Sequence, residues 1–217
     1  MSKIDKNEIF DLVVNQLNYL FKDKNKIQKK NILLCLNNAF DRTINCFSKI
    51  NNPYYFEKKK KSVLFNHLNS DQFSTFLYFL ANSCFERKKQ KNLCDKIYYL
   101  NKALNCLDLF YEVKMPDIFL LVHPVGTVLG RAEYSDYFIA YQGVNVGSNK
   151  NKYPKFSKYV TLRPSTSVLG KCYLEFNSEL ASGSTLIDRV LKKNSTYFGN
   201  PKNFYIKRKK EINNVWI

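Results

Sequence analysis

The sequence predicts an α+β protein in which a helical amino-terminal part is followed by a parallel β-helix. Two repeat lengths carry this prediction. Up to about residue 107, apolar residues recur with the 3.6-residue period of an α-helix, whereas from about residue 118 they recur every six residues. The chain has 217 residues and is 45% hydrophobic, which is enough for one sizeable core or two small ones.

The amino-terminal part is expected to consist of packed helices. The clearest helix follows Ser70, its predicted N-cap, because apolar residues then fall at i, i+3, i+4, i+7 and i+11. These residues are Phe73, Phe76, Leu77, Leu80 and Cys84. Similar stripes predict helices over 8–21, 31–48 and 93–107. Stripes of this kind most commonly form a core, so no ligand is assigned to them.

The six-residue period matches neither a helix nor a strand. It runs in two series whose phases differ by four residues, and the polar segment 147–155, GSNKNKYPK, lies between them. A loop there accounts for the four-residue excess, because the segment carries the Gly and Pro of a turn. The series are Val122, Val128, Tyr134, Ala140 and Val146, then Phe156, Leu162, Val168, Leu174, Leu180 and Leu186.

Small residues recur four positions after the apolar ones, at Ala132, Thr166, Cys172, Ser178 and Ser184. This double pattern predicts a solenoid with three short strands per turn. The large residue of each hexad points into a narrow triangular core, and the small one lies where the chain turns. An all-β sandwich, the alternative, would alternate within its strands and does not explain a period of six.

Composition argues against several classes of protein. Six cysteines without a CxxC pair and only two histidines predict no metal site, and the thiols are expected to be reduced core residues. The charged amino terminus and the lack of a long apolar run predict a cytoplasmic protein without a membrane span. The net charge of +17 lies in short separate runs, which we interpret as a solvated surface that attracts a small anionic cofactor rather than nucleic acid.

Three segments resemble the hexapeptide-repeat acyltransferases, and among these the serine acetyltransferase group. HPVGTVLG (123–130) is similar to the family's HATGIVVG, YQGVNVG (141–147) to LQSVTLG, and FGNP (198–201) to AGVP. The resemblance covers roughly 93–201. It implies a left-handed β-helix, acetyl-CoA as co-substrate without a metal, and a homotrimer or a dimer of trimers.

On this basis we expect three parts. An α-helical domain covers 1–107, a left-handed β-helix acyltransferase domain covers 108–190, and a basic tail covers 191–217. The β-helix domain carries an extruded loop near 147–155.

His123 takes the position of the family's catalytic base. The chemistry agrees, because transfer of an acyl group to a hydroxyl needs a base near neutral pH and the chain has only two histidines. The other, His67, is in a predicted helical region and is interpreted as structural. The family's orienting Asp precedes its His by fifteen residues, which is Asp108 here, and Asp136 and Glu133 remain alternatives.

The resemblance also implies binding residues. Small residues at the family's Gly-Ala-Gly position allow the pantetheine arm of acetyl-CoA to approach the backbone, and lysines near the extruded loop meet its phosphates. The expected cofactor-binding residues are Gly147, Lys152, Lys155, Ala181, Ser182 and Gly183. The expected substrate-binding residues are Val122, Tyr141, Gln142 and Tyr153.

Two departures from the family bear on the acceptor. Val122 replaces an acidic residue that holds the amino group of serine, and Lys152-Tyr153 replaces Arg-His before the loop proline. A free amino acid needs charged partners, whereas an uncharged sugar tolerates Val122 and stacks on tyrosine. The stretch 123–147 also looks like relatives in surface-polysaccharide biosynthesis.

We therefore expect an acetyl-CoA-dependent O-acetyltransferase acting on a sugar or glycan precursor. Serine O-acetylation in cysteine biosynthesis is the alternative. A non-catalytic hexapeptide scaffold or a basic nucleic-acid-binding protein comes third.

Overall fold

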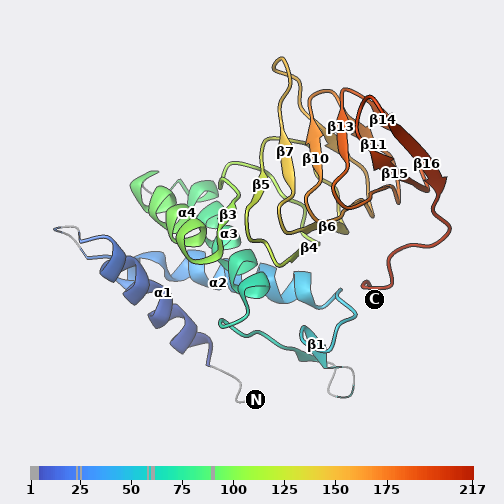
Figure 1. Ribbon diagram of the computed structural model, residues 1–217. Coiled ribbons are helices and arrows are strands. Elements are labelled where there is room, and N and C mark those ends of the chain that lie inside the picture. The colour runs from blue at the N-terminus through green and yellow to red at the C-terminus, as the bar shows by residue number, and fades with distance from the viewer. Residues whose placement is uncertain (1–4, 23, 25, 58, 60–61, 89–90) are drawn as a thin grey trace.

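The computed structural model describes residues 5–22, 24, 26–57, 59, 62–88 and 91–217. Helices form one part of the molecule and a β-solenoid the other, and the two lie against each other (Figure 1). No helix among these residues is long and apolar enough to cross a membrane. The helical part contains α1 (Lys6–Leu20), α2 (Lys29–Phe47), α3 (Ser70–Glu86) and α4 (Lys91–Asn105), with a hairpin of β1 (Phe56–Glu57) and β2 (Ser62–Val63).

Helix α3 is the centre of the helical part. Its residues 72–84 are all buried, because α2, α4 and the first strand of one solenoid sheet pack around it. The predicted apolar stripe is thus buried, together with the polar residues between its members. The N-cap is Asn69 rather than Ser70, since the Asn69 side chain accepts a hydrogen bond from the N–H of Asp71 and Ser70 is already helical. His67 lies in the turn before α3 and not in a helix.

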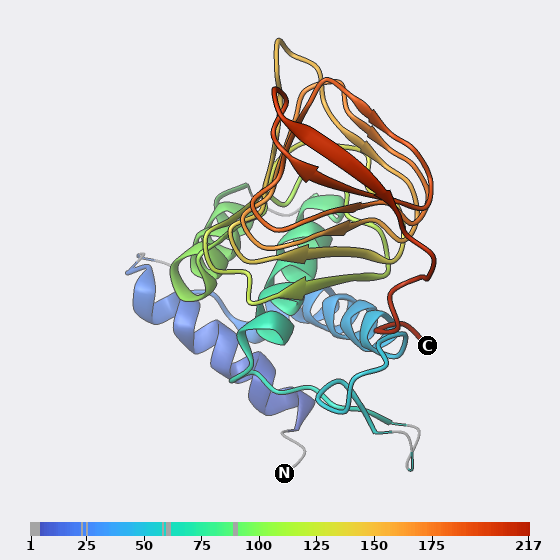
Figure 2. The ribbon, with the colours of Figure 1, turned by 45° about the vertical axis from the view of Figure 1, so that its right-hand side comes forward.

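Three parallel sheets form the sides of the solenoid (Figure 2). Sheet I contains β3 (Leu107–Asp108), β5 (Thr127–Leu129), β7 (Asn145–Gly147), β10 (Ser167–Leu169) and β13 (Thr185–Ile187). Sheet II contains β8 (Lys155–Phe156), β11 (Tyr173–Leu174) and β14 (Val190–Leu191). Sheet III contains β4 (Phe119–Val122), β6 (Phe138–Tyr141), β9 (Thr161–Leu162), β12 (Glu179–Leu180) and β15 (Ser195–Gly199), and antiparallel β16 (Phe204–Arg208) pairs with β15.

The predicted six-residue period is confirmed from Tyr134 to Leu186, apart from the interval of ten residues between Val146 and Phe156. Inward residues of successive turns stack in columns. The column of sheet III is fully buried and consists of Leu121, Ala140, Leu162, Leu180 and Tyr197. The predicted small residues Thr166, Cys172, Ser178 and Ser184 are buried at the corners.

The first turn of the solenoid departs from the prediction. Val122 and Val128 are not the inward residues, because Leu121 pairs with Ala140 and Leu129 pairs with Val146. Leu129 is 1% exposed and Val128 is 39% exposed. The corner between β4 and β5 is longer than the later corners, so the inward residues on its two sides are not six apart.

The polar segment between the two series forms a narrow hairpin that projects beyond β7 (Figure 1). Asn149 and Lys152 exchange backbone hydrogen bonds of 3.1 and 2.9 Å around Lys150 and Asn151. Those two residues have φ values of 48° and 57°, the left-handed conformation that a two-residue hairpin turn requires.

Part of the segment predicted as a basic tail belongs to regular structure. The hairpin of β15 and β16 closes the solenoid, and the chain then returns to the helices. Val215 accepts a hydrogen bond from the Asn51 N–H at 2.6 Å, and Trp216 forms an isolated bridge with Ile50. The end of the described chain thereby ties the solenoid to the helical part.

Candidate functional site

His123 lies at the corner where the chain passes from sheet III to sheet I. It follows β4 and has a φ of 48°, a left-handed conformation that is uncommon for a residue other than glycine. Its side chain is 74% exposed. The strained backbone therefore presents the imidazole to solvent instead of the core, as a proton-transfer group requires.

The carboxylate that lies against His123 comes from the helical part. Asp71, in the first turn of α3, accepts a hydrogen bond from the His123 backbone N–H at 3.0 Å. The Nδ1 atom of His123 is 3.8 Å from the same oxygen, which is an ion-pair distance. Burial raises the pKa of Asp71, although the nearby His123 imidazole and backbone N–H oppose the rise.

Asp71 was missed by the sequence reasoning. It is 52 residues away from His123, and the two meet only because α3 packs against β4. The one available signal was an acidic residue in the first turn of a predicted helix, which is commonly explained by the helix dipole alone.

Asp108, predicted as the orienting carboxylate, has two partners on α4. Its Oδ1 accepts from the Tyr98 hydroxyl at 2.5 Å, and its Oδ2 is 2.6 Å from the Lys102 Nζ. Burial acts to raise the pKa of Asp108, but the hydrogen bonds from Lys102 and Tyr98 outweigh it and hold the pKa below its ordinary value. Its role as partner of His123 stays a prediction.

The two alternative carboxylates are also engaged elsewhere. Asp136 accepts a hydrogen bond from the Ile118 N–H at 3.2 Å, and Glu133 pairs with the Lys155 ammonium at 2.6 Å. Among the residues that the structure describes, the acid that contacts His123 is therefore Asp71.

Several predicted binding residues lie on the same corner of the solenoid as His123. Backbone hydrogen bonds link each turn to the next, from Gly143 to Val125, from Ser165 to Gln142 and from Gly183 to Pro164. This corner stack contains the predicted Gln142, Ala181, Ser182 and Gly183.

The stack is open at its far end. Gly183 has a φ of 72°, and a Cβ added there would meet no atom within 4 Å. Ser182 and Gly183 are exposed, which leaves room for an extended ligand to lie against the backbone. The buried Oε1 of Gln142 has no hydrogen-bond partner among the described residues.

The remaining cofactor candidates lie beyond the carboxyl ends of the sheet I strands, away from the corner that holds His123. Gly147 ends β7, Lys152 is exposed on the hairpin, and Lys155 pairs with Glu133. Tyr153 is on the same hairpin, where the Arg131 guanidinium lies 5.3 Å from its ring centroid. Within one chain, the length of the sheet I strands separates this group from His123.

The last two substrate candidates form a row on the outer side of sheet III. Val122 pairs with Tyr141 in the register of β4 and β6. The Tyr141 hydroxyl accepts a hydrogen bond from Arg163 at 3.2 Å. Arg163 was not among the predicted site residues, because its position in a hexad corner gave no sign of this contact.

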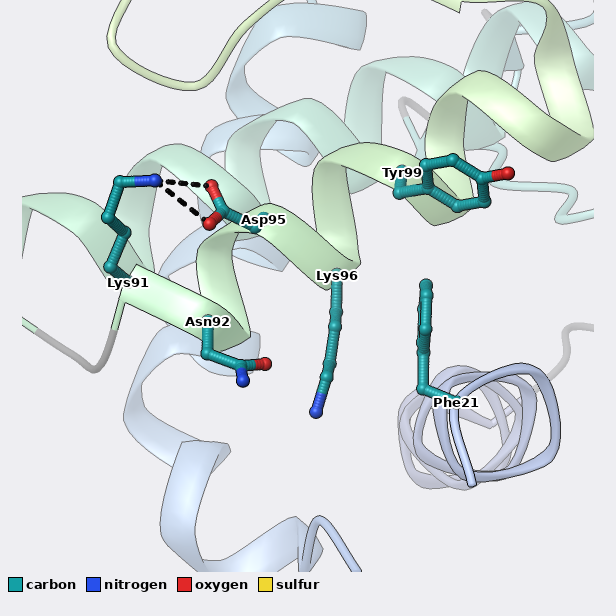
Figure 3. A pocket seen from close by; sticks show the side chains of 6 residues that line it. All are labelled: Phe21, Lys91, Asn92, Asp95, Lys96 and Tyr99. Carbon is teal, nitrogen blue, oxygen red and sulfur yellow. Dashed lines mark hydrogen bonds and ion pairs between the residues drawn. The ribbon is translucent and has the colours of Figure 1, made fainter. Parts of the chain in front are cut away.

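A cavity of about 420 Å³ lies between the end of α1 and α4 (Figure 3). The Lys91 ammonium and the Asp95 carboxylate form an ion pair of 3.0 Å on its wall. The lining residues are Phe21, Lys91, Asn92, Asp95, Lys96 and Tyr99. None of them is a predicted site residue. The described residues contain no group of three or more His, Cys, Asp or Glu side chains that could hold a metal ion.

The helices and the solenoid together form the fold of the hexapeptide-repeat, left-handed β-helix proteins. The chain is similar in structure to the serine acetyltransferase of Vibrio cholerae O1 biovar El Tor N16961, with a TM-score of 0.72 and 17% identity over 97% of this chain and 83% of that one. For the serine acetyltransferase of Brucella abortus strain S19, the TM-score is 0.70 and the identity 14%, over 96% and 85%.

A structure of the Brucella abortus enzyme in complex with coenzyme A is also similar, with a TM-score of 0.70 and 13% identity over 98% of this chain and 85% of that one. Neither a protein-family model nor a curated protein sequence matches the chain. At these identities the comparisons show the fold.

Proposed function

We propose that this protein is an acetyl-CoA-dependent O-acetyltransferase in which His123 is the general base. The observation that carries the proposal is the exposed imidazole beside a largely buried carboxylate, Asp71. The fold supports it, because similar structures are serine acetyltransferases and one of them is a complex with coenzyme A. The open corner stack ending at Gly183 has room for the pantetheine arm.

The arrangement determines which imidazole nitrogen of His123 carries the proton. Nδ1 faces Asp71, so Nδ1 carries the proton and Nε2 is free to accept one. Acetyl-CoA supplies the acetyl group as a thioester. His123 Nε2 takes the proton of the acceptor hydroxyl as its oxygen forms a bond to the acetyl carbon, and returns that proton to the sulfur when the C–S bond breaks. Asp71 stabilises the imidazolium between the two transfers.

The acceptor is inferred from the charges around His123. Val122 supplies no partner for an ammonium group, but Asp71 places a carboxylate next to the base from another direction. This removes the main objection to an amino-acid acceptor, and we place L-serine first. A sugar or glycan hydroxyl comes second, because the row of Val122 and Tyr141 offers an apolar and aromatic wall.

We further propose that neighbouring copies in a trimer share their sites. The support is the position of Lys152 and Lys155, which sheet I separates from His123 of the same chain. These lysines then meet the phosphates of acetyl-CoA bound beside the His123 of another copy. Light scattering at micromolar concentration tests this proposal, and a monomer would contradict it.

The function is tested by measuring CoA release from acetyl-CoA with L-serine and with a panel of nucleotide sugars and glycans. Mass spectrometry of the products identifies the acetylated acceptor. L-serine is expected to give an O-acetylated product. Transfer to a sugar but not to serine would reverse the order of the two acceptors, and no transfer to any hydroxyl would contradict the proposal.

A further inference from the structure

Arg163 continues the row of Val122 and Tyr141 on the outer side of sheet III. Strand register places Val122 beside Tyr141, and the pairing of β6 with β9 brings Arg163 beside Tyr141 in turn. The guanidinium carbon is 5.3 Å from the Tyr141 ring centroid. Two strand spacings of about 4.8 Å separate Arg163 from the residue that precedes His123. An extended ligand that reaches His123 can therefore also touch Arg163.

Two contacts hold the Arg163 side chain in place. Its Nε donates to Glu179 Oε1 at 2.7 Å, and its Nη1 donates to the Tyr141 hydroxyl at 3.2 Å. The Lys209 Nζ lies 2.9 Å from the other oxygen of Glu179. The Glu179 and Lys209 side chains are each 12% exposed, whereas Arg163 is 35% exposed. Both oxygens of the carboxylate are thus occupied from the protein side.

The cluster of Arg163, Glu179 and Lys209 has an excess of positive charge. It contains two cations and one carboxylate, and no other acid in the described parts of the chain pairs with either cation. The Lys209 Nζ is shielded from solvent and its approach to Glu179 lacks hydrogen-bond geometry. A guanidinium has five N–H donors, so Arg163 keeps unused donors at its exposed end. A partly desolvated cation of this kind is stabilised by an anion.

We infer that Arg163 binds an oxyanion, a carboxylate or a phosphate, of a ligand whose reacting group lies at His123. A fixed planar guanidinium suits two parallel hydrogen bonds to either group. The inference rests on the proposed function, which leaves two sources for the anion. One is the carboxylate of an amino-acid acceptor, and the other is a phosphate of acetyl-CoA.

A binding experiment tests the site without turnover. Inorganic phosphate at constant ionic strength is expected to raise the melting temperature of the wild type and of Arg189→Gln, a control arginine that stacks on Phe204 at 4.1 Å. The rise is expected to disappear in Arg163→Gln. Arg163→Lys keeps the charge and serves as the test if the glutamine variant does not fold. In this variant the rise is expected to shrink, because the two parallel donors are lost.

Kinetics with two matched pairs of substrates identifies the source of the anion that Arg163 binds. L-serine and L-serinamide differ in the carboxylate, and acetyl-CoA and its 3′-dephospho analogue differ in one phosphate. Arg163→Gln is expected to raise KM at least about tenfold for the anionic member of one pair and to remove the preference for it, while kcat changes little, because one charge-assisted contact is lost. The pair in which the preference is lost identifies the source of the anion.

Two results would overturn the inference. One is a phosphate-induced stabilisation that persists in Arg163→Gln, and the other is a variant that treats both pairs as the wild type does. A protein that transfers no acetyl group to any acceptor refutes the proposed function instead, and the phosphate experiment then still decides whether Arg163 binds an anion.

Discussion

The helical part and the solenoid bury their side chains in different ways. In the solenoid, each strand contributes one inward residue to a column, and its neighbours are the equivalent residues one turn before and after. In the helical part, α3 is buried between α2, α4 and β4, which come from before and after it in the sequence. A residue's environment therefore follows from a short repeat in one part and from the whole tertiary arrangement in the other.

The candidate site lies where the two parts meet. The solenoid supplies His123 on the corner between β4 and β5, and α3 supplies Asp71. The two parts therefore contribute in different ways to the proposed reaction, and substitutions on each side of their boundary separate these contributions.

The largest effect is expected at the solenoid corner. His123→Ala should lower kcat/KM by about 10²–10⁴, the range typical of general-base catalysis, because the exposed side chain contributes a base and little core volume. His67→Gln, the control at the other histidine, should keep wild-type turnover. Steady-state kinetics and thermal unfolding measure both, and an active His123→Ala protein would exclude the assignment.

The next prediction tests the corrected register of the first turn. Leu129→Ala should lower the free energy of unfolding by about 2–5 kcal/mol, because it leaves a cavity in the solenoid core. The adjacent Val128→Ala should cost about 0.5 kcal/mol or less, since Val128 faces outward. Denaturant unfolding provides both values. Equal costs would contradict the register in the structure, and the reverse order would mean that the phase predicted from the sequence is correct.

A smaller effect is expected from the helical side of the site. Asp71→Asn should lower kcat about 10- to 100-fold, because it removes the charge that stabilises the His123 imidazolium. Asp108→Asn should have a weaker effect on kcat, since its contacts are with Tyr98 and Lys102. Comparing the two variants at matched stability distinguishes the partners, and a larger loss from Asp108→Asn would restore the carboxylate that the sequence predicts.

The smallest effect concerns acid stability at the outer side of sheet III. Burial acts to raise the pKa of Glu179, but the hydrogen bond from Arg163 and the positive charges of Lys209 and Arg163 hold it below its ordinary value. The ionised carboxylate therefore adds stability at neutral pH, and this is lost as the pH falls through the lowered folded-state pKa. Glu179→Gln should cost about 1–3 kcal/mol near pH 7 and progressively less in acid.

Melting temperatures of the wild type and Glu179→Gln between about pH 3 and pH 7 measure this dependence. Glu175→Gln, at an ion pair with Lys192 on the surface, is the control and should show a weaker dependence. If the difference in melting temperature between Glu179→Gln and the wild type stays constant across this range, the carboxylate is not selectively stabilised in the folded state.

The sequence by itself determined the parts of the protein that depend on the repeat. The period of six, the interval left by the loop, the inward residues from Tyr134 onward and the small corner residues all follow from local spacing, because each turn packs on the next in the same way. His123 was identified from a matched motif and not from the repeat, because the corner on which it lies is the irregular one.

Only the tertiary structure decided the features that arise between distant segments. Asp71 reaches His123 because α3 packs on β4, and Lys209 reaches Glu179 because β16 folds back on β15, which pairs with β12. The phase of the first turn was also decided there, since the strand pairing of Leu129 follows from the length of one irregular corner. No local period encodes these contacts, because each depends on how whole elements pack together.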